Sequence, residues 1–226
     1  MRIKAALIDM DGTLYDSMPN HARAWMKVMN EINVEASPDE FFLYEGCTGA
    51  WFIDRMIRRQ FGRPATEEEK KGYYQLKAHY FTQQPPVDVM PGAIKMVTDL
   101  QKLGIDTVLV TGSGQNSLLN RLNEDFPGAF PMEKRVTSAS VTHGKPHPEP
   151  YLKGAELAGV SAAETIAIDN APLGVKSAKD AGCFTIGVVT GPIPRTELEK
   201  AGADIVFDSL VECAENLSQI IKQLEN

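Results

Sequence analysis

The stretch AALIDMDGTLYDS, residues 5–17, joins an apolar run to a polar loop. Residues 5–8 are all apolar and predict a short buried strand. Asp9 and Asp11 follow that strand, and positions two apart share one side of an extended chain. Gly12 gives the backbone the freedom for a sharp exit. The stretch therefore predicts a strand whose end presents two acids to one pocket.

The two acids alone leave their chemistry open. Two close carboxylates repel each other unless a cation lies between them or one of them carries a proton. The pair Asp9 and Asp11 thus favours a Mg²⁺ site, a division into acid and base roles, or both. An acidic turn that caps a helix would show the same residues, so the remaining chain has to decide.

The composition limits the class of protein. The chain has 226 residues, of which 43% are hydrophobic, enough for one α/β domain with a smaller domain inserted in it. The net charge of -7 and the lack of a basic run argue against a nucleic-acid partner. The three cysteines form no CxxC pair, and we find no leader-like start or bilayer-length apolar run. We therefore expect a cytoplasmic monomer with no membrane partner.

Residues 17–87 carry only helical patterns. Asn20 can cap a helix whose apolar positions 22, 25, 26, 29 and 32 recur at helical spacing. Further helices are predicted over 38–45, 48–61 and 66–81, and Thr66 opens the last one as part of a capping box. Pro19 and Pro85-Pro86 flank the block. It predicts a helical cap domain over 17–87, inserted in a core domain made of 1–16 and 88–226.

After the cap, helices and strands alternate. The pattern predicts strands at 107–110, 136–139, 165–168, 184–189 and 205–207, and helices at 91–103, after Ser113, and at 149–158, 171–181 and 210–224. Apolar strands separated by helices predict the α/β class, with a doubly wound, Rossmann-like parallel sheet covered on both faces. The ligand site of such a sheet lies at the carboxyl ends of its strands.

Polar residues follow the predicted strands at the points where they end. Besides the first two acids, these residues are Thr111 and Gly112, Lys145, and Asp169 with Asn170. Each has an ordinary explanation on its own, as a helix cap or a solvated lysine. Because parallel strands end at one edge of their sheet, we expect the whole set to converge.

The converging set predicts phosphoryl transfer. A phosphate needs a cation, donors arranged around its oxygens, an in-line nucleophile and an acid for the leaving oxygen. Asp9, Asp169 and Asn170 would hold Mg²⁺, and Thr111, Gly112 and Lys145 would bind the phosphate oxygens. Asp9 is the candidate nucleophile, and Asp11 is the candidate acid. A carboxylate nucleophile implies an aspartyl-phosphate intermediate.

Four motifs, in order, resemble the haloacid dehalogenase superfamily of phosphohydrolases, in the branch with an inserted helical cap. They are DMDGT at 9–13, the strand ending at Thr111, GKPHPEPY at 144–151 and IDNAPLGV at 168–175. The resemblance implies that Asp9 attacks phosphorus and that Asp11 protonates the leaving group and then activates water. It also implies that the main-chain carbonyl of Asp11 helps to bind Mg²⁺.

Within that superfamily the chain is similar to β-phosphoglucomutase-like members, which also carry a His-x-Arg-Ala-Trp segment, here HARAW at 21–25. Two departures stand out. Asp169-Asn170 occupies the place of a Glu-Asp pair, and the cap loop YEGCTG at 44–49 lacks the arginine that would hold a second phosphate. Losing that cation favours hydrolysis over a mutase reaction, which stays the alternative.

The cap loop also bears on the substrate. Glu45 would repel a phosphate unless a metal ion bridged them. Glu45 and Thr48 in this loop, together with the NAPLG segment, resemble a subgroup that hydrolyses inorganic pyrophosphate, which we rank first among small phosphorylated substrates. The alternative for Glu45 is a solvated carboxylate at a helix end. His21 either holds the hinge or touches the attacking groups, unless it is simply packed.

A third hypothesis comes from another class: a non-enzymatic phospho-acceptor switch that resembles response-regulator receivers. Such receivers also gather acids, a hydroxyl and a lysine on a doubly wound sheet. The predicted helical cap opposes this alternative, because a receiver needs no such insertion.

Overall fold

A computed structural model describes residues 2–114 and 116–225. Its core is a six-stranded, all-parallel sheet in the order β3-β2-β1-β4-β5-β6. The strands are β1 (Ala5–Ile8), β2 (Asp106–Val110), β3 (Arg135–Val136), β4 (Thr165–Asp169), β5 (Phe184–Val188) and β6 (Ile205–Phe207). This sheet confirms the predicted doubly wound α/β class.

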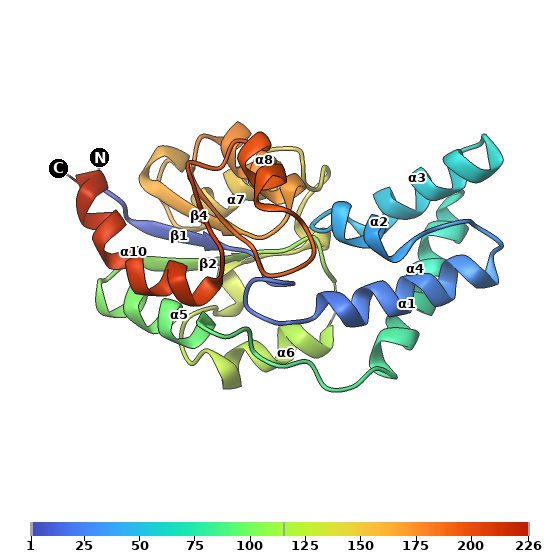
Figure 1. Ribbon diagram of the computed structural model, residues 1–226, viewed down its shortest axis with the longest axis horizontal. Helices are drawn as coiled ribbons and strands as arrows, with labels where there is room; N and C mark the ends of the chain where they lie inside the picture. Colours follow the sequence, from blue (N-terminus) through green and yellow to red (C-terminus); the bar gives the residue numbers. More distant parts are fainter. Residues whose placement is uncertain (1, 115, 226) are drawn as a thin grey trace.

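Helices cover both faces of the sheet (Figure 1). One face carries α5 (Ala93–Lys102), α6 (Asn116–Asp125) and α10 (Leu210–Glu225); the other carries α7 (Glu149–Leu157), α8 (Pro172–Ala181) and the short α9 (Arg195–Lys200). Successive strand residues point to opposite faces, so Ile8 belongs to the first core cluster and Leu7 to the second. Burial on both faces explains the uninterrupted apolar strands.

Strand β1 lies at the centre of the sheet. It pairs with β2 on one side and with β4 on the other, so that Leu7 lies between Val108 and Ala167. The loops that follow these three strands therefore leave the same edge, side by side. This arrangement places the acids that follow β1 beside Thr111 and Asp169.

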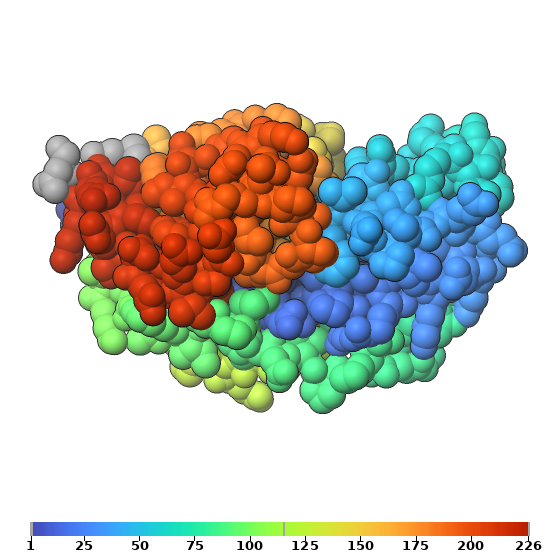
Figure 2. All heavy atoms as spheres, in the orientation of Figure 1, coloured from blue at the N-terminus to red at the C-terminus, as the bar shows by residue number. Residues whose placement is uncertain are grey.

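The cap consists of α1 (Met18–Glu31), α2 (Pro38–Leu43), α3 (Gly49–Phe61) and α4 (Glu67–Thr82). It lies beyond the carboxyl ends of the strands, on the right of Figure 1, and has a separate core cluster that includes Trp25, Phe41 and Phe52. Figure 2 shows blue atoms of the cap directly against the orange atoms of the core. The cap thus covers the edge where the polar residues gather.

The two chain crossings between core and cap lie next to each other. The Asp16 amide donates to the Asp88 carbonyl at 3.0 Å, and the Met90 amide donates to the Leu14 carbonyl at 2.9 Å. The Asn20 side chain donates to the Pro85 carbonyl at 2.8 Å. These bonds lie at the expected domain boundaries, 16/17 and 87/88; the outer ends at 1 and 226 lie outside the described residues.

Some element boundaries differ from the sequence expectations. Helix α1 begins at Met18, so Asn20 is not its cap, and its side chain bonds the other crossing instead. Strand β3 covers only 135–136, because Ser138–Ser140 forms a 3-10 turn in which the Ser140 hydroxyl accepts from the Thr137 amide. Helix α9 was not predicted, since its six residues, RTELEK, contain a single apolar residue, Leu198, and so show no helical period.

Among the described residues, no helix combines the length and the apolar character needed to cross a bilayer.

Candidate active site

A buried lysine joins two carboxylates at the edge of the sheet. Lys145 Nζ donates to Asp9 Oδ1 at 2.6 Å and to Asp169 Oδ2 at 2.7 Å, and all three side chains are buried. The Tyr151 hydroxyl also donates to Asp169 Oδ2, at 2.6 Å, and the Ala171 amide donates to Oδ1, at 2.9 Å. The ends of β1 and β4 are thereby fixed to the loop before α7.

The charge of this group depends on whether Asp9 is ionised. Burial raises the pKa of Asp9; Lys145 opposes that shift, and the neighbouring Asp169 and Asp11 add to it. Burial alone would lower the pKa of Lys145, but the two carboxylates it contacts raise it above its usual range. One ammonium thus faces two carboxyl groups, and the group would carry one excess negative charge with both of them ionised, which the raised pKa of Asp9 opposes.

Asp11 has a different set of partners. Its Oδ1 accepts from the Ser17 hydroxyl at 2.7 Å and from His21 Nε2 at 2.8 Å, and the Thr111 hydroxyl lies 3.4 Å from Oδ2. Burial would raise the pKa of Asp11, but His21, Ser17 and Lys77 together lower it to about 2. Asp11 is therefore held as a carboxylate beside the phosphate donors.

His21 links Asp11 to a buried lysine of the cap. Lys77 Nζ lies 2.6 Å from His21 Nδ1, and the Lys77 residue is only 2% exposed. An ammonium group has only donors, so Nδ1 accepts and the Nε2 proton points to Asp11. Burial, reinforced by Lys77, lowers the pKa of His21, and burial lowers the pKa of Lys77 to about 8.

Sequence reasoning missed Lys77. A signal was present, because Lys77 lies three residues after Tyr74 and four before Phe81, which puts it on an aromatic face of α4. Its Nζ lies 5.1 Å from the Phe81 ring centre and 5.8 Å from that of Tyr74. A lysine on the apolar face of an amphipathic helix is a candidate for a buried, partnered role.

Glu45 of the cap loop reaches the core. It is 5% exposed, and its Oε1 accepts from Asn170 Nδ2 at 2.9 Å, while Asn170 Oδ1 accepts from the Thr13 hydroxyl at 3.1 Å. Burial raises the pKa of Glu45 well above its usual range; Asn170 opposes the shift, and the charges of the nearby aspartates add to it. Glu45 is therefore not the solvated carboxylate that the sequence left open.

Two glycines let the cap loop approach the core. A Cβ on Gly12, whose φ is 81°, would lie 2.2 Å from Asn170 Nδ2 and 2.5 Å from Glu45 Oε1. A Cβ on Gly112 would lie 2.2 Å from the Gly46 carbonyl oxygen. Both contacts are too close for any side chain, so the sequence needs glycine at each position.

Between cap and core lies a cavity of about 70 Å³. Its core side carries Asp9, Asp11, Thr111 and Gly112, and its cap side carries His21, Glu45, Lys77 and the aromatic residues Trp25, Phe41, Tyr44, Phe52 and Tyr74. The volume is small beside the 300–1,000 Å³ of pockets for drug-sized ligands. The cavity therefore suits a compact ligand.

Four of the proposed site residues do not line this cavity. Asn170 lies in the wall of a neighbouring pocket, together with Gly12 and Glu45. Lys145 and Asp169 lie behind Asp9, where they hold it, and have no atoms in the cavity wall. Thr48 lies farther away: its hydroxyl accepts from the Trp51 amide at 3.3 Å and caps α3. Thr48 thus has a structural role in this arrangement.

The oxygen ligands around Asp9 fit a hard divalent cation. Asp9, Asp169 and Glu45 are buried carboxylates and Asn170 adds an amide oxygen, which matches the preference of Mg²⁺ for oxygen. Asp169 Oδ2 already accepts two hydrogen bonds, but Oδ1 accepts only one of those described and keeps a lone pair. A cation would also neutralise the excess negative charge that the group carries with both carboxyl groups ionised.

Comparisons with known proteins identify the family of the chain. A family model for haloacid dehalogenase-like hydrolases matches residues 3–182. Hexitol phosphatase A of Escherichia coli (strain K12) is 32% identical over 210 residues, which cover 93% of this chain and 93% of that protein. Beta-phosphoglucomutase of Bacillus subtilis (strain 168) is 26% identical over 217 residues, which cover 90% and 88%.

A solved structure from Bacteroides vulgatus, provisionally described as a beta-phosphoglucomutase, has a TM-score of 0.96 and 43% sequence identity. The match covers 100% of this chain and 91% of that one. The relatives are enzymes of phosphate esters, which removes the receiver-like switch as an explanation. The protein is a phosphatase-type enzyme whose relatives act on small phosphorylated compounds, and the chain belongs to the haloacid dehalogenase-like hydrolase family.

Proposed function

We propose that the enzyme is a Mg²⁺-dependent hydrolase of a small phosphorylated metabolite, with inorganic pyrophosphate ranked first. The observation that carries this proposal is the burial of Glu45 against Asn170, inside the cavity that faces Asp9. A carboxylate in that place disfavours a bare phosphate. A carboxylate there suits a substrate that binds as a complex with metal ions, as pyrophosphate does.

The residues of the core have separate roles in this proposal. An Asp9 oxygen attacks phosphorus and the bond to the leaving oxygen breaks, which gives an aspartyl-phosphate. Lys145 fixes Asp9 for this attack, while the Thr111 hydroxyl and the Gly112 amide bind the phosphoryl oxygens. Asp9, Asp169, Asn170 and the main-chain carbonyl of Asp11 would hold Mg²⁺, which would supply positive charge to the phosphoryl oxygens.

Asp11 handles the protons. In the second step its carboxylate accepts a proton from the water that hydrolyses the aspartyl-phosphate. In the first step a leaving alkoxide would take its proton from the acid form of Asp11, which the low pKa of Asp11 disfavours. A phosphate leaves more readily than the alkoxide of a sugar, so pyrophosphate asks less of Asp11 as an acid. The carboxylate form in which His21 and Ser17 hold Asp11 suits such a substrate.

A second candidate is a sugar-phosphate substrate, handled by a phosphatase or a mutase. The aromatic cap wall formed by Trp25, Tyr44 and Tyr74 favours it, because such rings pack well on an organic group. However, a mutase must hold two phosphates. No arginine appears among the described residues that line the cavity, and Lys77 is already bonded to His21.

The test is a substrate panel with Mg²⁺: pyrophosphate, a hexitol phosphate, and β-glucose 1-phosphate with a bisphosphate primer. We expect pyrophosphate to give the highest kcat/KM and the primed glucose phosphate to release free phosphate without forming its isomer. Dominant isomer formation would establish the mutase instead. A hexitol phosphate turned over faster than pyrophosphate would establish the second candidate as a phosphatase.

Glu45→Gln tests the role of the Glu45 charge, because glutamine keeps the size of the side chain and removes its charge. We expect a loss of roughly tenfold or more in kcat/KM for pyrophosphate and little change for a monoester. Glu68→Gln is the matched control, since Glu68 is an exposed carboxylate on the cap helix α4. Equal losses for both substrates in Glu45→Gln would contradict a metal-linked role for this residue.

A further inference from the structure

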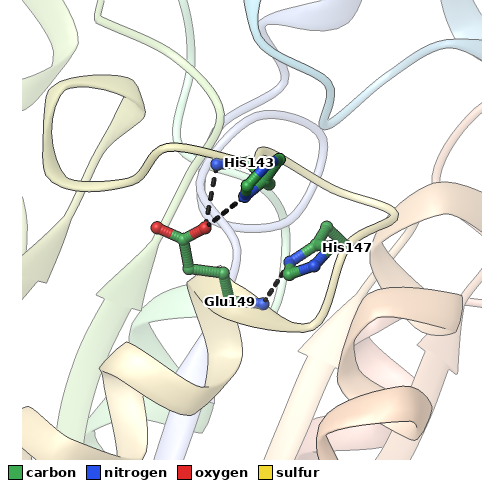
Figure 3. A group of neighbouring side chains, drawn as sticks. All are labelled: His143, His147 and Glu149. Carbon is green, nitrogen blue, oxygen red and sulfur yellow. Dashed lines mark hydrogen bonds and ion pairs between the residues drawn. The ribbon is translucent and has the colours of Figure 1, made fainter.

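A second group of side chains that could hold a metal lies outside the cavity, in the loop before α7 and at the first residue of that helix. Figure 3 shows His143, His147 and Glu149 gathered on this loop. His143 Nδ1 lies 3.0 Å from Glu149 Oε2, and the two imidazole ring centres are 4.7 Å apart. One ligand atom from each residue lies within 4.8 Å of the others.

The spacing of these atoms approaches that of a metal centre. In a tetrahedral Zn²⁺ site with bonds of about 2.0–2.2 Å, neighbouring ligand atoms are roughly 3.3 Å apart. The His143–Glu149 pair, at 3.0 Å, is already near this value. His147 Nδ1 accepts from the Glu149 amide at 3.2 Å, and this bond orients the ring. A turn of the ring would bring Nε2 closer to the ligand atoms of His143 and Glu149.

The loop holds two of these groups in place without a metal. Glu149 accepts from the Thr142 amide at 2.6 Å and from the His143 amide at 2.9 Å. The carboxylate is therefore fixed beside His143, whose side chain is 63% exposed and open to an ion from solvent. A pre-formed carboxylate lowers the ordering cost of binding.

We propose that His143, His147 and Glu149 form a binding site for a divalent transition metal of the Zn²⁺ type, with water completing its coordination. Two imidazoles and one carboxylate select such a metal over Mg²⁺, which prefers oxygen ligands alone. The site is thus chemically distinct from the carboxylate centre around Asp9. It adds a second metal that the phosphatase reaction does not require.

The place of this site in the chain gives it a consequence. His143 and His147 lie two residues before and two residues after Lys145, whose Nζ holds Asp9 and Asp169. A metal bound by both histidines holds the two ends of the lysine loop together. We therefore expect the metal to raise the melting temperature of the whole enzyme.

The test is a calorimetric titration of the full chain with ZnCl₂ in the presence of excess Mg²⁺, which occupies the oxygen-rich centre. We expect one equivalent of Zn²⁺ to bind. The affinity should fall roughly tenfold or more in His143→Ala and in His147→Ala. His79→Ala is the matched control, because His79 is an exposed histidine of the cap helix α4. Its affinity for Zn²⁺ should equal that of the wild type.

Two further measurements complete the test. Co²⁺ in place of Zn²⁺ should give the visible absorption of a four-coordinate centre in the wild type and lose it in both variants. The rise in melting temperature with Zn²⁺ should disappear in parallel, and His143→Gln replaces His143→Ala if the latter fails to fold. Undetectable binding, or binding that neither histidine variant weakens, would overturn the proposal while leaving the phosphatase activity as it is.

Discussion

The core side and the cap side of the cavity are built in different ways. On the core side, Asp9, Lys145 and Asp169 are locked to one another within a single domain. On the cap side, Glu45 bonds Asn170 and His21 bonds Asp11 across the domain boundary, while Lys77 of the cap holds the other ring nitrogen of His21. The sheet thus fixes the groups proposed for chemistry, whereas the groups proposed for substrate choice take their positions only when the cap lies against the core.

Asp9→Asn attacks the core side and has the largest expected effect. We expect kcat to fall roughly 10⁴-fold or more, because the nucleophile is lost, while the size of the side chain and the fold are kept. Phosphate release and the melting temperature measure the two expectations. Asp16→Asn, an exposed aspartate of the same loop, is the control and should be nearly as active as the wild type. Substantial turnover by Asp9→Asn would sink the proposed mechanism.

Lys77→Met tests whether the cap acts on the core through His21. We expect kcat to fall about 10–100-fold, because His21 loses the donor that directs its Nε2 proton to Asp11. KM should change less than kcat, and the fold should persist, since methionine fills the buried space. Lys71→Met, at an exposed lysine of the same helix, should leave both constants unchanged. A loss confined to KM would show that Lys77 binds substrate rather than positioning His21.

Gly112→Ala would separate the core side of the cavity from the cap loop. The added Cβ would lie 2.2 Å from the Gly46 carbonyl oxygen, so the cap loop has to withdraw. Overpacking of this kind costs about 1–3 kcal/mol, and we expect KM to rise roughly tenfold. Steady-state kinetics with the preferred substrate measure the change. An unchanged KM would mean that the contact between the Gly112 turn and the cap loop does not matter for binding.

Gly72→Ala has the smallest expected effect and is a control for glycine replacement. Gly72 lies within α4, and a Cβ there meets no atom within 4 Å. We expect the free energy of unfolding to rise by about 0.5–1 kcal/mol, because alanine favours a helix. Thermal melting should show an increase of a few degrees, about 2–4 °C, with kinetics unchanged. A decrease would indicate that α4 needs flexibility at this point.

The same division separates what the sequence could predict from what it could not. The site residues of the core could be predicted, because parallel strands end at one edge of the sheet and the residues after β1, β2 and β4 must meet there. The cap contacts depend on how two domains pack, which no local pattern encodes. Lys77 was missed although the aromatic face of α4 gave a local signal for it, and Thr48 was expected at the substrate although its hydroxyl caps α3.

The chain crosses between core and cap at two adjacent points, Asp16 and Asp88, so the cap can be replaced by another insertion. Because the chain leaves the core and returns to it at adjacent points, the core closes on itself whatever is inserted between them. Closing a longer or shorter insertion costs little, since loop-closure entropy grows only slowly with length. Evolution can therefore exchange one lid for another, and with it the choice of substrate, without rebuilding the sheet that carries out the reaction.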